Sequence, residues 1–132
     1  MAAADLVLDF LEFVERQPRQ SVRELLDKIL RQSRGLTGAE AGTIFIVRSR
    51  GGQRWLEPAS IQNDVIRVAP KAFIVTITPK SIAGFVAGSG EAALINDVYH
   101  IPATRPYGFN PANELKGYRT HSMLCFALKN YD

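Results

Sequence analysis

The hydrophobic period of this chain changes near residue 41, and this change constrains the fold more than any other feature. Upstream of it, apolar residues recur at helical spacing, and these are Val22, Leu25, Leu26, Ile29 and Leu30. Downstream, the β-rich run "AGTIFIVRS" begins at Ala41 and is followed by Gly51-Gly52 and "QRWLEPASIQ". Two such runs joined by two glycines predict a hairpin. A helix is therefore expected to lead directly into an antiparallel sheet.

Local signals predict the limits of two helices. The segment Ala4–Val14 has an apolar face opposite acidic residues, which predicts an amphipathic helix that ends at Pro18. Ser21 and Glu24 form an S-x-x-E capping box, which predicts that the second helix begins there. Gly35 is the expected end of this second helix, because glycine readily closes a helix at its C-terminus.

The middle of the chain predicts a third strand and a short helix. Pro58 lies inside the second β-rich run and indicates an edge strand or a bulge, because proline cannot donate a ladder hydrogen bond. The run "AFIVTI" predicts the third strand. It is followed by "KSIAGFVAGSG", a short helix whose capping residue is either Ser81 or Thr78.

The last third of the chain combines two β-rich runs with a long connection. Strands are predicted in "AALINDV" and in "HSMLCFALKN". Residues 99–118 between them are rich in Pro, Asn and Gly, which predicts a long loop with one helical turn around residues 112–116. Together the elements describe an α+β domain built on an antiparallel sheet.

Composition and charge disfavour several classes of protein. The chain has 132 residues, the size of one domain, and its 16 Lys and Arg are interleaved with 13 Asp and Glu, which predicts no nucleic-acid partner. No apolar run reaches the roughly 18 residues that a membrane helix needs, so no membrane partner is expected. The acidic N-terminal segment does not resemble a signal peptide, and the single Cys125 has no partner for an internal disulfide. We therefore expect a cytoplasmic protein.

Two ordered strings, "SIAGFVAGSGEAALINDVYHIP" and "RPYGFNPANELKGYRTHSMLCFALKN", closely resemble the second half of a GAF domain. That family has a Ser-x-x-Gly-x-Val-Ala helix, a Gly-Glu turn, an Ile-x-Asp strand end, a Phe-Asn loop and a Gly-Tyr-Arg-Thr-x-Ser-x-Leu run. The upstream string "LLDKILRQSRGLTGAEAGTIFIV" resembles the helix and first strand of the same family. The resemblance covers about Ser21 to Asn130 and implies a GAF/PAS-like fold, with helices on one face of the sheet and an N-terminal helix pair.

The resemblance also nominates a ligand site, because GAF domains hold their ligand between the sheet and the helices and loop on one face. The nominated residues are Ser81, Ile82, Ala83, Asn96, Asp97, Phe109, Asn110, Thr120 and Ser122. Structural roles stay open for several of them: Ser81 as a helix cap, Asp97 as a brace of the long loop, and Phe109 as a plug in the core of that loop. Arg119 is either a ligand contact or an ion-pair partner of Glu91 or Asp97.

Two departures from the family pattern shape the expectations. The Asn-Lys-Phe-Asp-Glu signature of the cyclic-nucleotide-binding branch is not intact, since Phe109 is followed by Asn110, with Asn113 and Glu114 where the Asp would be. We therefore expect a small-molecule ligand of unknown identity, with no cofactor and no favoured cyclic nucleotide. Family members also continue past "ALKN" into an apolar strand beside the first strand. The chain is thus expected to be a fragment in which the edge of Gly42–Val47 is open to pairing with another chain.

The resemblance implies a binding module and not an enzyme. It predicts a regulatory, small-molecule-sensing domain of a bacterial signal-transduction protein that controls an output domain outside this chain. A ligand-free scaffold for dimerisation or protein interaction is the alternative. A small redox enzyme is disfavoured, because stand-alone GAF proteins that reduce methionine sulfoxide use several cysteines and this chain has one. His100 and His121 lack companion ligands at a suitable spacing, so no metal is expected.

Residues 1–18 are expected to form a separate helical segment before a GAF domain at residues 19–132. Family members often dimerise through a helix that precedes the sheet, and Leu6, Phe10 and Phe13 form an apolar stripe on this one. We therefore predict a homodimer. Packing of the same stripe onto the sheet of its own domain is the alternative.

Overall fold

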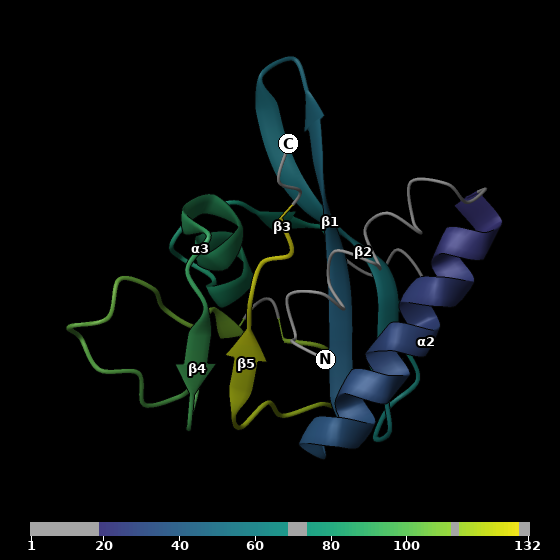
Figure 1. The fold of residues 1–132 in the computed structure, drawn as a ribbon. Helices are drawn as coiled ribbons and strands as arrows, with labels where there is room; N and C mark the ends of the chain where they lie inside the picture. The colour runs from purple at the N-terminus through teal and green to yellow at the C-terminus, as the bar shows by residue number, and fades with distance from the viewer. Residues whose placement is uncertain (1–18, 69–73, 112–113, 130–132) are drawn as a thin grey trace.

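The computed structural model describes residues 19–68, 74–111 and 114–129 (Figure 1). The predicted helix Ala4–Val14, with its stripe of Leu6, Phe10 and Phe13, lies outside the described residues. So do the start of "AFIVTI" and part of the helical turn predicted near residue 112.

Helix α2 spans Arg19–Thr37 and packs its apolar face on the first sheet. Leu26 and Leu30 are buried, as the helical period predicts. The predicted capping box is wrong, because the helix begins two residues before Ser21. Pro18 precedes this start in the sequence, and a proline disfavours helix for the residue before it, not for those that follow.

The C-terminal end of α2 also differs from the prediction. The helix continues through Gly35 and ends at Thr37. Gly38 adopts a left-handed φ of 72°, and the Ala39 N–H donates to the Arg34 carbonyl at 3.1 Å. This pair forms the glycine-terminated motif that satisfies the last carbonyls of a helix. Gly38 therefore ends the helix where Gly35 was expected to do so.

The predicted hairpin is confirmed as strands β1 (Ala41–Arg50) and β2 (Gln53–Asn63), which pair antiparallel. Gly51 and Gly52 have φ values of 58° and 83°, the left-handed pair that a tight two-residue hairpin turn requires. The register shifts between Ile44 and Phe45, opposite Pro58, which confirms the predicted bulge.

Strand β3 (Val75–Thr76) pairs with the other edge of β2, at Trp55 and Leu56. The sheet order β1-β2-β3 therefore places Pro58 in the central strand and β1 at an edge. The edge position suggested for the proline strand is wrong, because the bulge removes the need for a proline donor there. No strand pairs with the outer edge of β1 in the described chain, in agreement with the expected open edge.

The second half of the fold contains helix α3 (Ile82–Ser89) and a two-stranded sheet of β4 (Ala93–Ile95) and β5 (Met123–Cys125). Both strands are shorter than the β-rich runs that predicted them. A compact core joins the helix to the sheet, and its buried members are Ile82, Phe85, Val86, Ala93, Ile95 and Val98.

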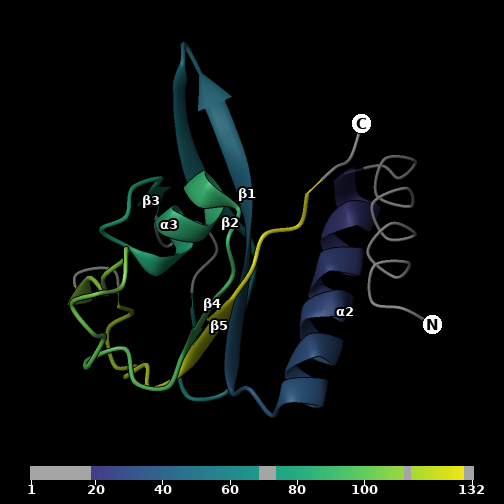
Figure 2. The same cartoon turned by 60° about the vertical axis from the view of Figure 1, so that its left-hand side comes forward.

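The elements confirm an α+β domain with antiparallel strands, but their layering differs from the expectation. The strands form two separate sheets and not one. Helices α2 and α3 lie on opposite sides of the strands and not on one face (Figure 2). The physical reason is that α2 packs on β1 and β2, whereas α3 contacts β3 and β5. Neither α2 nor α3 is long and apolar enough to cross a membrane.

Candidate functional site

A cavity of about 1030 Å³ lies between the two sheets and is partly open to solvent. Helix α2 and strand β1 form one wall, and α3, β4, β5 and the long loop form the other. Most of the lining is apolar with scattered hydroxyl and amide groups, which is typical of sites for small organic molecules. The cavity is wide because β1 and β5 both line it without pairing with each other.

Eight of the nine nominated residues line this one cavity. They come from the start of α3, the end of β4, the long loop and the segment before β5, and they are Ser81, Ile82, Ala83, Asn96, Phe109, Asn110, Thr120 and Ser122. The fold thus brings together groups that are far apart in the sequence. Contact of each with a ligand stays a prediction.

The start of α3 is fixed by Ser81, which is 8% exposed. Its hydroxyl accepts a hydrogen bond from the Gly84 N–H at 3.0 Å, so the helix-cap role left open for Ser81 is confirmed. The alternative cap is wrong, because the Thr78 hydroxyl instead accepts from the Lys80 N–H within the preceding turn. Ser81 therefore sets the first turn of α3 against the cavity.

The long loop is held by Glu114, a residue that sequence reasoning noted only as a departure from the family signature. Its carboxylate accepts hydrogen bonds from the Tyr99 hydroxyl and, at 2.7 Å, from the Thr120 N–H. These bonds stabilise the charged form, so the pKa of Glu114 lies below its ordinary range, with the Tyr99 bond as the largest cause. The Tyr99 ring in turn packs edge-on against Phe109, and the Arg119 guanidinium lies over it at 4.1 Å.

Phe109 and Arg119 thus have defined structural contacts around Tyr99. Phe109 joins the apolar cluster of the loop, as the plug interpretation proposed, and it also lines the cavity. For Arg119 the structure records stacking on the Tyr99 ring rather than an ion pair with Glu91 or Asp97. The loop is therefore fixed from both of its ends.

Asp97 is the one nominated residue that does not line the cavity. Its carboxylate accepts from the Tyr99 N–H at 2.9 Å and lies 2.9 Å from Nδ1 of His100. The backbone hydrogen bond is the main cause that lowers the pKa of Asp97, and the contact with His100 adds to it. The structural role considered for Asp97, a brace of the long loop, is therefore confirmed.

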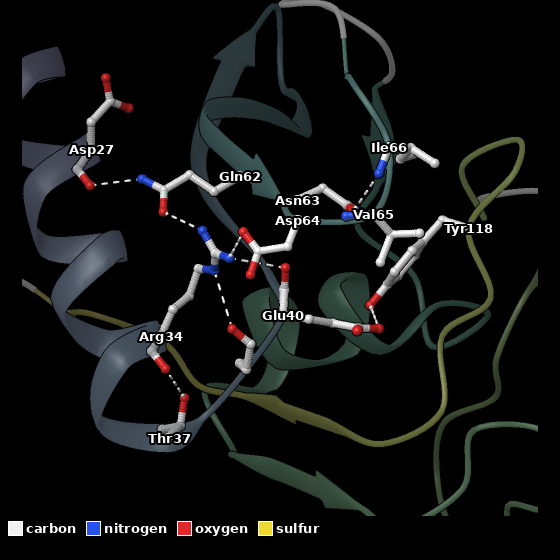
Figure 3. A network of polar contacts seen from close by, with 11 residues as sticks. Asp27, Arg34, Thr37, Glu40, Gln62, Asn63, Asp64, Val65, Ile66 and Tyr118 are labelled. Carbon is white, nitrogen blue, oxygen red and sulfur yellow. Dashed lines mark hydrogen bonds and ion pairs between the residues drawn. The ribbon is translucent and has the colours of Figure 1, made fainter.

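A second group of polar contacts lies at the α2–β1 end of the cavity (Figure 3). Arg34 forms an ion pair with Asp64 at 2.6 Å and donates to the Gln62 side chain at 2.9 Å and to the Glu40 carbonyl at 3.0 Å. The Tyr118 hydroxyl donates to the Glu40 carboxylate at 2.9 Å. Burial, with this carboxylate as a second cause, raises the pKa of Tyr118 to about 12, so the phenol remains a hydrogen-bond donor at neutral pH.

The charge of the cavity wall limits the ligands that it suits. None of the described lining residues is Asp or Glu, whereas Arg34, Arg54 and Lys129 are basic. Such a wall favours a neutral or anionic ligand over a cation.

No three His, Cys, Asp or Glu side chains in the described ranges gather closely enough to hold a metal ion. Cys125 lies in β5, where burial raises the pKa of its thiol and lowers its reactivity.

Comparison with known proteins finds similarity to a phosphodiesterase. Over 120 residues the chain is 31% identical to the dual 3′,5′-cyclic-AMP and -GMP phosphodiesterase 11 of Drosophila melanogaster. The chain is similar to part of a phosphodiesterase. The aligned region covers 83% of this chain but only 8% of the phosphodiesterase.

Two further comparisons gave no match. No family model matches the chain, and no solved structure matches it at a significant level. The similarity to the phosphodiesterase concerns one short region of a much longer protein.

Proposed function

We propose that this chain is a GAF-type regulatory domain of a signal-transduction protein. It binds a small molecule between α3 and the long loop and controls an output domain elsewhere in the full protein. The observation that carries this proposal is the convergence of eight residues, nominated by the resemblance to GAF domains, on one cavity of suitable size and polarity. The similarity to part of a signalling phosphodiesterase supports it. The bacterial origin, the cytoplasmic location and the homodimer stay predictions.

The proposed role is binding and not catalysis, and the cavity suggests the chemical class of the ligand. Apolar walls with amide and hydroxyl groups suit an organic molecule with a flat or apolar body, and a wall without acids suits one that is neutral or anionic. The phosphodiesterase carries cyclic AMP and cyclic GMP in its name, so these are the first compounds to test. The broken signature around Phe109 argues that another small molecule is the ligand.

The proposal is tested by native mass spectrometry of the purified chain, followed by calorimetric titration with cyclic AMP, with cyclic GMP and with any small molecule that co-purifies. We expect a bound small molecule of one defined mass. A chain that carries no adduct and takes up none of these compounds at millimolar concentration contradicts the proposal.

Phe109→Ala is expected to weaken ligand binding about tenfold, because it removes an aromatic wall of the cavity. The matched control is Tyr107→Ala, which removes another aromatic ring of the same loop that does not line the cavity. Both affinities are measured by titration with the compound found in the first experiment. Equal losses in the two variants would mean that Phe109 acts only through the packing of the loop.

One observation favours the alternative, a scaffold for association. The face of the β4–β5 sheet that is turned away from α3 is an apolar row formed by Leu94, Leu124, Phe126 and Leu128, which also line the cavity and whose exposed fractions are 76%, 54%, 57% and 41%. Leu94 and Leu124 are direct cross-strand partners, and alternate residues of the same segment point into the core instead. A continuous apolar face of this kind often marks a protein interface.

If the chain self-associates through this face, Leu124→Gln and Phe126→Gln are each expected to raise the dimer dissociation constant about tenfold, because they place a polar group in an apolar contact. Leu36→Gln is the matched control, since Leu36 is 90% exposed and lies at the end of α2. The molar mass is measured by light scattering over a dilution series. A monomer at all concentrations, or equal effects of the three variants, counts against the scaffold.

A further inference from the structure

Tyr118 connects the two halves of the fold across one end of the cavity. It lies in the long loop and lines the cavity, and its hydroxyl donates to Glu40, which is 78 residues away and directly precedes β1. In Figure 3 the Tyr118 side chain reaches from the loop to this carboxylate. The contact therefore fixes how far the loop lies from β1.

The acceptor side of this contact is held rigidly. The Glu40 carbonyl accepts from the Arg34 guanidinium at 3.0 Å and from the Asp64 N–H at 2.9 Å. The Arg34 side chain also donates to Gln62, forms an ion pair with Asp64, and donates through Nε to the Ala39 carbonyl at 3.2 Å. Glu40 is thus attached to the last turn of α2 as well as to the first sheet.

The donor side belongs to the segment that carries nominated ligand residues. The Tyr118 N–H donates to the Leu115 carbonyl at 3.0 Å, and Gly117 provides the left-handed φ of 85° in this turn. Thr120 and Ser122 follow directly and line the cavity. A displacement of Tyr118 therefore moves these two residues relative to the opposite wall.

We propose that the Tyr118–Glu40 hydrogen bond is a latch, which holds the loop over the cavity and opens when a ligand enters or leaves. Its opening also releases one restraint on the α2–β1 junction through Arg34, so occupancy of the cavity is coupled to the end of α2. The bond is exposed to solvent and thus modest in net strength, which suits a contact that opens and closes readily. This inference rests on the proposed function, since it assigns a gate to the same cavity.

The latch is tested first without any ligand, by hydrogen–deuterium exchange of the wild type, Tyr118→Phe, Glu40→Ala and the double variant. Either single change is expected to speed exchange in residues 38–42 and 114–122 about tenfold, and the double variant to exchange no faster than the singles. Tyr107→Phe is the matched control, because it removes the hydroxyl of another tyrosine of the loop. Rates within about twofold of wild type in both single variants, or the same increase in Tyr107→Phe, overturn the latch.

The gate is tested by stopped-flow fluorescence with 8-anilinonaphthalene-1-sulfonate, an anionic probe with an apolar body. Tyr118→Phe is expected to raise both the association and the dissociation rate about tenfold while the dissociation constant changes little, since a gate alters the barrier and not the bound state. An altered dissociation constant with unchanged association rate overturns the gate and indicates a direct contact. If the probe does not bind the wild type, the proposed site fails, whereas the exchange experiment still decides the latch.

Discussion

Gly84→Ala is expected to lower the free energy of unfolding by about 2 to 3 kcal/mol, because a methyl group at this position has no space. A Cβ built on Gly84 would lie 2.5 Å from the carbonyl oxygen of Thr76 and 2.6 Å from that of Thr78. Both contacts are with backbone, so they can be relieved only if α3 moves away from β3. The free energy of unfolding is measured by urea denaturation of both proteins.

Gly88→Ala is the matched control for this prediction, because it makes the same substitution in the same helix. Its Cβ would lie 3.3 Å from a methyl group of the Ile77 side chain, which can adjust. Alanine also favours helix over glycine by about 1 kcal/mol. We therefore expect Gly88→Ala to be neutral or stabilising, and a Gly84→Ala protein as stable as Gly88→Ala would show that α3 is not held as closely as the structure indicates.

The shift of α3 in Gly84→Ala has a consequence for the site. Ser81, Ile82 and Ala83 form the first turn of α3 and line the cavity. The close packing at Gly84 therefore fixes the position of this cavity wall and also stabilises the fold. The three-residue spacing of Ser81 and Gly84 also allows the helix cap to form, since the Ser81 hydroxyl accepts a hydrogen bond from the Gly84 N–H.

Features that depend on short-range signals were predictable from the sequence. The buried face of α2 and the Gly51-Gly52 turn were predicted outright, whereas the Pro58 bulge and the Ser81 cap were each one of two predicted alternatives. All four involve residues close together in the chain. The prediction that Gly35 ends α2 was wrong, because Gly38, three residues later, can close a helix equally well. The structure places the left-handed residue at Gly38.

The arrangement of the sheets and the polar contacts could not be predicted in the same way. Glu40 and Tyr118 carry no local pattern that links them, and neither do Arg34 and Gln62, which are 28 residues apart. Separate sheets also arise from long-range packing, since β-rich runs alone do not specify their partners. The candidate site was found only through the family resemblance, which supplied residues that the fold then brings together.

Glu114→Ala is expected to make the long loop about tenfold more susceptible to limited proteolysis, because two hydrogen bonds to a charged acceptor are lost. The Tyr99 hydroxyl and the Thr120 N–H both donate to the same carboxylate oxygen of Glu114. Glu114→Gln keeps an oxygen acceptor at this position without the charge and is the matched control. We expect it to stay within about threefold of the wild type, since neutral hydrogen bonds are weaker but still formed.

The pH dependence separates a charge effect from a purely steric one at Glu114. Since its pKa is lowered in the folded protein, Glu114 contributes stability above the ordinary pKa of a glutamate, and this contribution is lost as the pH falls through the lowered value. Proteolysis of the wild-type loop by an acid-active protease should therefore accelerate across that range. Residue 114 cannot titrate there in Glu114→Gln, so the acceleration of its loop should be smaller than that of the wild type. An identical acid response of the two proteins would place the titrating group elsewhere, with Asp97, whose pKa is also lowered in the same loop, as the next residue to replace.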